Sequence, residues 1–173
     1  MDFFERKMLS DDAFKRMLEV GSMDLNGTVR MIAEVFHPSE YIGIDLEPGK
    51  CVDLVLDVKD IVEKFGENSF DVVICSEMLE HVEYWRTAVN NMKRVLKPGG
   101  HIYITTRSYG FGYHAYPEDY WRYSREDVWK MFSDFKINCL EDDTEYPGVF
   151  LKATKPEDWK PKDLSRINVF SMQ

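Results

Sequence analysis

Acidic residues, a serine and a glycine stand at the ends of four short apolar runs. They are Glu19 and Gly21 after the first run, Asp45 after the second, Asp57 after the third, and Ser76 and Glu77 after the fourth. Carboxylates accept hydrogen bonds from ribose hydroxyls and attract an ammonium group, but they repel a pyrophosphate. A single acid here is as readily a solvated loop residue or a helix cap. Their repetition favours a site for a ligand that carries hydroxyl and ammonium groups.

The loop after the first run, from Gly21 to Gly27, departs from the dinucleotide fingerprint G-x-G-x-x-G. Met23 and Asn26 stand where the second and third glycines belong, so the backbone cannot approach a pyrophosphate in the usual way. We expect the loop to present backbone amides to a carboxylate, with Asp24 or Asn26 capping the helix that follows. An ordinary strand-to-helix turn is the alternative.

The apolar runs have the length and composition of β-strands. They read RMLEVG, EYIGID, CVDLVLDV, FDVVIC and HIYITT, and the later runs FKINCL and GVFLKAT are expected to form a closing antiparallel pair. Strands that alternate with helices form parallel sheets with right-handed crossovers. The predicted fold is therefore a doubly wound, mostly parallel, Rossmann-like α/β sheet with an antiparallel C-terminal strand pair, in a three-layer αβα sandwich. Ligands of such sheets bind at the carboxyl ends of the strands.

Three helices are predicted between these runs. The clearest has an apolar face at alternating steps of four and three and ends before Pro98-Gly99-Gly100; its face is Met78, Val82, Trp85, Val89, Met92 and Leu96. A second helix begins after Asn26 and stops before Pro38. A third begins at Ser124, whose spacing to Asp127 resembles a capping box. The tail, interrupted by proline and lysine, is expected to lack regular structure.

The composition fits one enzyme-sized domain. The chain has 173 residues, 44% of them hydrophobic, and we expect a single domain over residues 1–155 with a C-terminal extension over 156–173. A formal net charge of −9 makes nucleic acid an unfavourable partner. No apolar window approaches a membrane span, and three widely spaced cysteines with a charged N-terminus indicate the cytoplasm. A monomer or a homodimer is expected.

The order of these segments resembles the class I S-adenosylmethionine-dependent methyltransferases, as a small type-11-like methyltransferase domain. The segments are LEVGSMDLNG, YIGIDLEPG, DLVLDV, FDVVICSEMLEHV and NMKRVLKPGGHIYITT, within residues 16 to 140. The most specific is FDVVICSEMLEHV followed by LKPGG. The resemblance implies S-adenosyl-L-methionine as cofactor and S-adenosyl-L-homocysteine as product. Members usually carry E/D-x-G-x-G-x-G, whereas Met23 and Leu25 replace its second and third glycines here, so this loop must take another path.

The resemblance also implies roles for single residues. Glu19 and Gly21 would line the methionine end of the cofactor, and Asp45 would accept both ribose hydroxyls. Asp57 and Val58 would lie along the adenine. The complete set of residues expected at the cofactor is Glu19, Gly21, Ser22, Asn26, Asp45, Leu46, Asp57, Val58, Ser76, Glu77 and Met78.

The segment from Arg107 to Ser124 is the candidate acceptor site. Seven of its eighteen residues are Phe, Tyr or Trp, and long aromatic loops in compact domains are usually lids or binding loops. Its YPEDYWRYS looks like a motif of small methyltransferases, some with roles in modifying glycans or other small metabolites. The alternative for Trp121 is that it packs the loop on the sheet. Residues expected to bind the acceptor are Arg107, Tyr109, Tyr116, Tyr120, Trp121 and Arg122.

Methyl transfer from a sulfonium needs alignment and exclusion of water more than it needs reactive protein groups. A general base is required only when the acceptor loses a proton, and His114 and His81 are the candidates. A solvated loop residue and a helix-surface residue are the respective alternatives. No His-rich or D-x-D spacing indicates a ligand set, so no metal is predicted.

Three functions therefore remain open from the sequence. The first is a methyltransferase that acts on a small molecule or a glycan. The second is a catalytically silent cofactor-binding subunit with a regulatory or partner role. The third is a nicotinamide-dependent oxidoreductase or epimerase, which the missing dinucleotide fingerprint disfavours.

Overall fold

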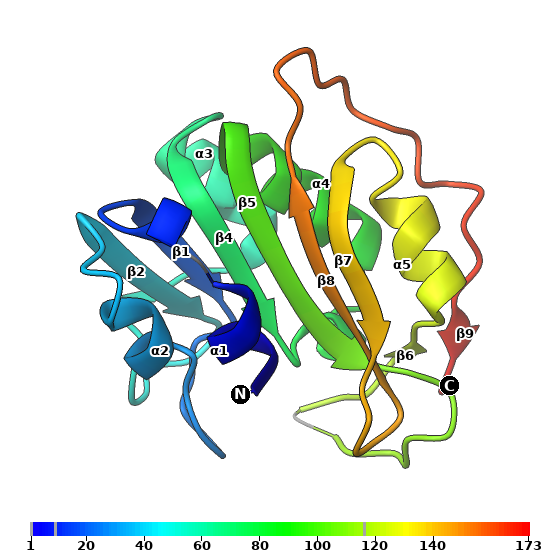
Figure 1. Ribbon diagram of the computed structural model, residues 1–173. Coiled ribbons are helices and arrows are strands. Elements are labelled where there is room, and N and C mark those ends of the chain that lie inside the picture. Colours follow the sequence, from blue (N-terminus) through cyan, green and yellow to red (C-terminus); the bar gives the residue numbers. More distant parts are fainter. Residues whose placement is uncertain (1, 9, 116) are drawn as a thin grey trace.

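A seven-stranded sheet forms the centre of the computed structural model, which describes residues 2–8, 10–115 and 117–173 (Figure 1). Its strands lie in the order β3-β2-β1-β4-β5-β8-β7. Strands β1 to β5 run parallel, and β8 is antiparallel to both of its neighbours. The predicted sheet, mostly parallel with an antiparallel C-terminal pair, is confirmed. The strands are β1 (Arg16–Val20), β2 (Glu40–Asp45), β3 (Leu54–Val55), β4 (Phe70–Ser76), β5 (Leu96–Arg107), β7 (Lys136–Asp142) and β8 (Gly148–Thr154).

Helices cover both faces of the sheet and complete the three layers (Figure 1). Helices α1 (Asp2–Lys7) and α2 (Arg30–Glu34) lie on one face, and α3 (Ile61–Phe65), α4 (Trp85–Val95) and α5 (Arg125–Met131) lie on the other. Side chains of a strand alternate between the faces. In β4, Val72 and Ile74 therefore join the core under α1 and α2, whereas Val73 and Cys75 join the core under α4 and α5.

Helix α4 begins at Trp85, whereas the sequence predicts a start near Met78. Residues Leu79–His81 form the 3₁₀ turn η3, and Val82 after it is extended. His81, expected one turn into the helix, therefore lies outside it. The helix ends at Val95, and β5 begins at once and contains the Pro-Gly-Gly segment.

Hydrogen bonds from a distant segment explain this late start. The carbonyls of residues 79, 80 and 82 accept from the Tyr123 hydroxyl at 3.0 Å, the Tyr120 amide at 2.8 Å and the Trp121 indole Nε1 at 2.9 Å. A helix needs such carbonyls for its own backbone bonds. Contacts between distant segments thus replace the helical pattern that the apolar spacing predicts.

Three further elements differ from the prediction. Strand β3 is only two residues long. Helix α2 begins at Arg30, and its N-cap Val29 offers no side-chain cap, so the expected cap from Asp24 or Asn26 is wrong. Asp24 instead accepts from the Gly27 amide at 3.0 Å, which closes the turn before the helix. Helices α1 and α3 are additional to the predicted ones.

The C-terminal tail folds back onto the domain. Strand β9 (Phe170–Ser171) pairs antiparallel with β6 (Trp121–Arg122), so the expectation of a tail without regular structure is wrong at these residues. Leu164 and Ile167 are buried in the core beside α4. The tail therefore supports segment 120–122 from outside.

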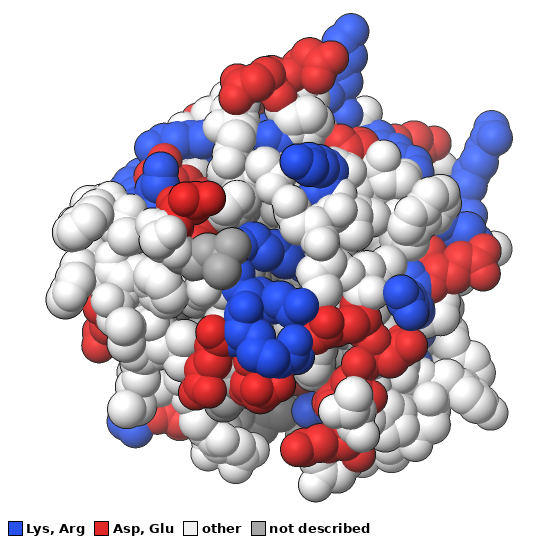
Figure 2. All heavy atoms as spheres, viewed as in Figure 1, with Lys and Arg blue, Asp and Glu red and all other residues white. Residues whose placement is uncertain are grey.

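Acidic and basic side chains lie intermingled on the face shown in Figure 2. Ion pairs are common in this chain; Arg6 pairs with Asp2 at 2.6 Å and with Glu141 at 2.7 Å. The face in view offers no uniformly positive surface to a phosphate backbone. Among the described residues, no helix has the length and apolar character needed to cross a bilayer.

The capping box at the start of α5 yields a stability prediction. Ser124 Oγ accepts from the Asp127 amide at 3.1 Å, and the Asp127 carboxylate accepts from the Ser124 amide at 2.9 Å. Ser124→Ala is expected to lower the free energy of unfolding by about 1 kcal/mol in urea denaturation. Ser124→Asp keeps a side-chain acceptor and should stay close to the wild type. An equal loss in both variants would contradict the cap.

Candidate functional site

The carboxyl ends of β1, β2 and β4 meet at one edge of the sheet, the lower edge in Figure 1. Val20 lies opposite both Ile44 and Cys75 in the strand register, so the residues that follow these three stand side by side. Gly21 has a φ of +77°, and a Cβ there would lie 2.6 Å from Met78 Cγ. Only glycine fits this position, and its lack of a side chain keeps the edge open.

Asp45 projects from the end of β2 beside this loop. One carboxylate oxygen accepts from the Leu46 amide at 2.7 Å and the other from the Met23 amide at 3.2 Å. A carboxylate offers about four acceptor positions, so Asp45 retains capacity for further hydroxyl donors. The buried Ser22 hydroxyl lies against Gly43 of β2 and has no hydrogen-bond partner among the described residues, whereas Asn26 is exposed.

Glu19 is buried below this edge, with 3% of its surface exposed. Burial raises the pKa of Glu19 to about 7, although the Tyr41 hydroxyl, which donates to it at 2.7 Å, opposes the rise. Its carboxyl group therefore already has a protein partner in this conformation.

Asp57 has most of its acceptor capacity in use. The Tyr84 hydroxyl lies 2.7 Å from both oxygens, and Lys59 contributes its amide and its ammonium, each at 2.9 Å. Val58 beside it is buried in the core. An adenine amine at Asp57 must therefore compete with Tyr84, a residue that the sequence reasoning did not single out.

Glu77 adopts a strained backbone at the end of β4. Its φ of 52° lies in the left-handed region, which is uncommon for a residue other than glycine and often marks functional sites. Its carboxylate forms an ion pair with Arg107, which also lies 3.4 Å from Asp143. Burial raises the pKa of Glu77, and the Arg107 charge opposes this.

Ser76, the residue before Glu77, contacts the neighbouring strand β5. Its Oγ lies 3.2 Å from Thr105 Oγ1.

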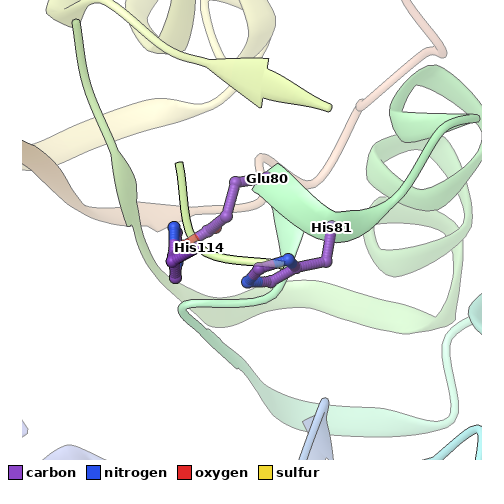
Figure 3. A group of neighbouring side chains, drawn as sticks. All are labelled: Glu80, His81 and His114. Atoms are coloured by element: carbon purple, nitrogen blue, oxygen red, sulfur yellow. Dashed lines mark ion pairs between the residues drawn. The ribbon is translucent and has the colours of Figure 1, made fainter. Parts of the chain in front are cut away.

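Glu80, His81 and His114 converge just beyond Glu77 (Figure 3). Glu80 is fully buried; one oxygen accepts from Thr106 Oγ1 at 2.8 Å, and within residues 2–8, 10–115 and 117–173 the other oxygen has no hydrogen bond. Burial, with the nearby Glu77 carboxylate, raises the pKa of Glu80 to about 8. The predicted helix placed Glu80 on its outer face, so sequence spacing gave no signal of this grouping.

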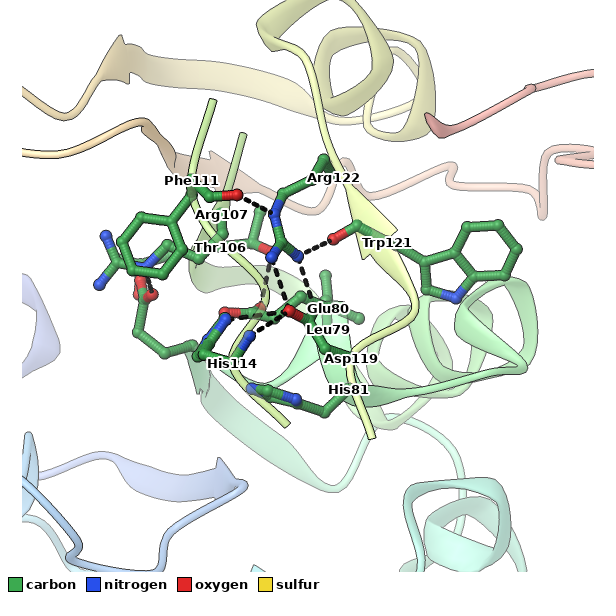
Figure 4. Close-up of polar contacts among 12 residues, drawn as sticks. Leu79, Glu80, His81, Thr106, Arg107, Phe111, His114, Asp119, Trp121 and Arg122 are labelled. Carbon is green, nitrogen blue, oxygen red and sulfur yellow. Dashed lines mark hydrogen bonds and ion pairs between the residues drawn. The ribbon is translucent and has the colours of Figure 1, made fainter. Parts of the chain in front are cut away.

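Arg122 and Asp119 form a buried ion pair that anchors the aromatic segment (Figure 4). Both side chains are fully buried. The guanidinium donates twice to Asp119, at 2.5 and 2.6 Å, and once each to the carbonyls of Phe111, Gly112 and Trp121. These five bonds use all five N–H donors of an arginine. Arg122 therefore has none left for a substrate, in contrast to its predicted role in acceptor binding.

Asp119 also orients His114. One Asp119 oxygen accepts from the His114 amide at 2.8 Å and lies 3.1 Å from His114 Nδ1. Burial lowers the pKa of His114, and the Asp119 charge opposes this. The imidazole is therefore neutral near pH 7, as a proton acceptor must be.

The remaining acceptor candidates divide between surface and core. Tyr109 is 76% exposed and packs edge-on against Phe170. Tyr120 is half-buried, and Trp121 packs partly buried on the core, in agreement with the packing alternative. Tyr116 lies outside the described residues.

The Arg122 ion pair predicts a large loss of stability on truncation. Arg122→Leu leaves the Asp119 charge buried without a cation, and we expect a loss of roughly 3–5 kcal/mol in the free energy of unfolding, measured in urea. Arg125→Leu removes an exposed cation 3.7 Å from Asp142 and should change little. Similar losses in the two variants would contradict the assigned role of Arg122.

Glu19 predicts a pH-dependent stability. Because its pKa is raised from 4.5 to about 7 in the folded chain, the stability it contributes is present below pH 4.5 and is lost as the pH rises through 7. The free-energy advantage of the wild type over Glu19→Gln should fall by roughly 3 kcal/mol between these pH values and then level off. Urea denaturation of both proteins at several pH values measures this. A difference independent of pH would contradict the buried, protonated carboxyl.

Comparison with known sequences identifies a family. The profile of the methyltransferase domain family matches residues 18–104, which is half of the chain. A ubiquinone biosynthesis O-methyltransferase from Ralstonia nicotianae is 30% identical over 99 residues, which are 57% of this chain and 38% of that protein. The matched part thus spans less than two fifths of that curated relative.

Two solved structures share the fold at 14% identity. An S-adenosylmethionine-dependent methyltransferase from Archaeoglobus fulgidus gives a TM-score of 0.71 and covers 89% of this chain and 92% of that one. The Burkholderia thailandensis 1,6-didemethyltoxoflavin-N1-methyltransferase was solved with 1,6-didemethyltoxoflavin and S-adenosylhomocysteine bound. It gives a TM-score of 0.65, and the match covers 83% of this chain and 72% of that one. With the family match, the strand order and the glycine and carboxylate edge, this chain belongs to the methyltransferase domain family, whose cofactor is S-adenosylmethionine.

Proposed function

We propose that this protein transfers a methyl group from S-adenosylmethionine to a hydroxyl group of a small-molecule or glycan acceptor held beneath segment 107–124. The observation that carries the proposal is the edge formed by β1 and β2. Gly21 admits no side chain there, Asp45 keeps unused acceptor capacity, and the buried Ser22 hydroxyl lacks a partner. These features fit a ligand with a ribose and a polar amino-acid end.

The residues of this chain bind and orient the reactants. When bound, the cofactor supplies an electrophilic methyl group on a sulfonium. Asp45 accepts hydrogen bonds from the ribose hydroxyls, while Gly21 and Ser22 line the methionine end. Glu77 and Met78 close the cofactor site at the end of β4. Alignment of the acceptor with the methyl group and exclusion of water then provide most of the acceleration.

Segment 107–124 supplies the acceptor side. Tyr109 and Tyr113 are exposed aromatic side chains for the body of an acceptor, and Arg107 lies at the end of β5 beside Glu77. An oxygen acceptor must lose a proton. His81 and His114, the candidates for a general base, lie where the turn after β4 meets this segment. The Ralstonia relative is named an O-methyltransferase, which also favours an oxygen acceptor.

The catalytically silent subunit remains the second candidate. Met23 and Leu25 replace two glycines of the usual loop, and the Met23 amide already donates to Asp45. A cofactor must share or displace this hydrogen bond. Binding of S-adenosylhomocysteine together with no methyl transfer to any of a panel of phenolic, catecholic and sugar hydroxyls would favour this candidate.

Calorimetric titration with S-adenosylhomocysteine tests the cofactor site. We expect micromolar binding by the wild type, and a loss of roughly 2–4 kcal/mol in Asp45→Ala, because that variant removes charge-assisted hydrogen bonds. Glu47→Ala, an exposed acid two residues away, is the matched control and should bind normally. Unchanged affinity in Asp45→Ala would refute the ribose assignment. NAD is not expected to bind, and NAD binding would revive the nicotinamide alternative.

A further inference from the structure

Three side chains with metal-binding atoms meet where η3 and segment 107–120 touch (Figure 3). One ligand atom from each of Glu80, His81 and His114 lies within 4.8 Å of the other two. Glu80 and His81 are adjacent in the turn after β4, whereas His114 comes from the aromatic segment. The late start of α4 creates this grouping, because a helix from Met78 would turn Glu80 towards solvent.

Hydrogen bonds fix how both histidine rings are protonated. His81 Nδ1 lies 2.7 Å from the Glu118 carbonyl oxygen, and His114 Nδ1 lies 3.1 Å from an Asp119 carboxylate oxygen. Each Nδ1 must carry its proton to donate to these acceptors, which leaves a lone pair on each Nε2. Metal-ligating histidines are typically held in this way by an oxygen acceptor on the other ring nitrogen.

Glu80 contributes a buried carboxyl oxygen to this group. Its side chain is fully buried, and its Oε2 accepts from Thr106. Its Oε1 lies 3.9 Å from His114 Nε2 and has no hydrogen bond with any residue that the structure describes. Arg107 is paired with Glu77 and Asp143 instead. Buried carboxylate oxygens are normally satisfied by donors or metal ions.

We propose that Glu80, His81 and His114 bind a divalent transition-metal ion of the zinc type. Two imidazoles and one carboxylate form a common ligand set of catalytic zinc, and imidazole disfavours Mg²⁺ and Ca²⁺. Zinc ligands lie about 2.0–2.2 Å from the ion, so the three side chains close by about an ångström when it binds. The His114 side chain is 38% exposed, which leaves the outer side of the ion open to water or a substrate oxygen.

The role of the ion rests on the proposed methyl transfer. A metal-bound hydroxyl has a lowered pKa, so an acceptor on the ion releases its proton to water before attack. An oxygen lone pair then forms the C–O bond, and the electron pair of the breaking C–S bond stays on sulfur. With the ion bound, the histidines would serve as ligands in place of the general-base role given above, and they would take up no proton.

Metal titration of the full chain tests the site. After treatment with EDTA and its removal, the wild type is expected to bind one Zn²⁺ per chain in calorimetry, and Mg²⁺ at least 100-fold more weakly. Glu80→Gln, His81→Ala and His114→Ala should each weaken Zn²⁺ binding at least 100-fold. His37→Asn removes an exposed histidine far along the chain and should leave the Zn²⁺ affinity unchanged.

Two results would overturn the site: no Zn²⁺ uptake by the wild type, or equal affinity in the three ligand variants. If Glu80→Gln does not fold, the Zn²⁺ affinity of His81→Ala decides between the outcomes, because the His81 ring is only half-buried and its removal should be tolerated. S-adenosylhomocysteine titration of the same samples separates the two proposals. Cofactor binding without Zn²⁺ uptake refutes the metal site alone, and Zn²⁺ uptake without cofactor binding refutes the cofactor assignment alone.

Discussion

The buried ion pair between Asp119 and Arg122 fixes the segment that closes the candidate site. Burying two charges is costly unless their remaining donors and acceptors are also used, and here every guanidinium N–H has an acceptor. The same Asp119 carboxylate orients His114. Residues Tyr120, Trp121 and Tyr123 donate to the carbonyls of residues 80, 82 and 79, so that α4 begins late and Glu80 turns inwards. One polar contact thus determines the local backbone and the chemistry beside it.

The parallel sheet is the rigid frame that carries the candidate site. Its carboxyl edge places Gly21, Asp45 and the end of β4 side by side, because the register aligns the last residues of the three strands. The proposed cofactor side lies over β1 and β2, and the proposed acceptor side lies over β4 and β5. Glu77, with its left-handed backbone and its bond to Arg107, stands where the two sides meet.

Much of the fold could be predicted from the sequence because it depends on local signals. Apolar runs mark the strands, Ser124 and Asp127 mark the start of α5, and the C-terminal pair follows from two adjacent runs. The start of α4 could not be predicted, because Tyr120, Trp121 and Tyr123 supply its competing hydrogen bonds from forty residues away. Arg122 was expected at the acceptor because it is a polar group in the aromatic segment that could orient a substrate, although its three-residue spacing from Asp119 is a signal of a local ion pair. The meeting of His114 with Glu80 likewise depends on contacts that spacing does not encode.

A crystal structure of the complex with S-adenosylhomocysteine tests the central claim most directly. We predict electron density along the carboxyl edge, with the ribose at Asp45 and the sulfur directed towards Glu77 and Met78. Density at another place, such as the cavity of about 340 Å³ beside Asp12 and His101, would contradict the proposed cofactor site.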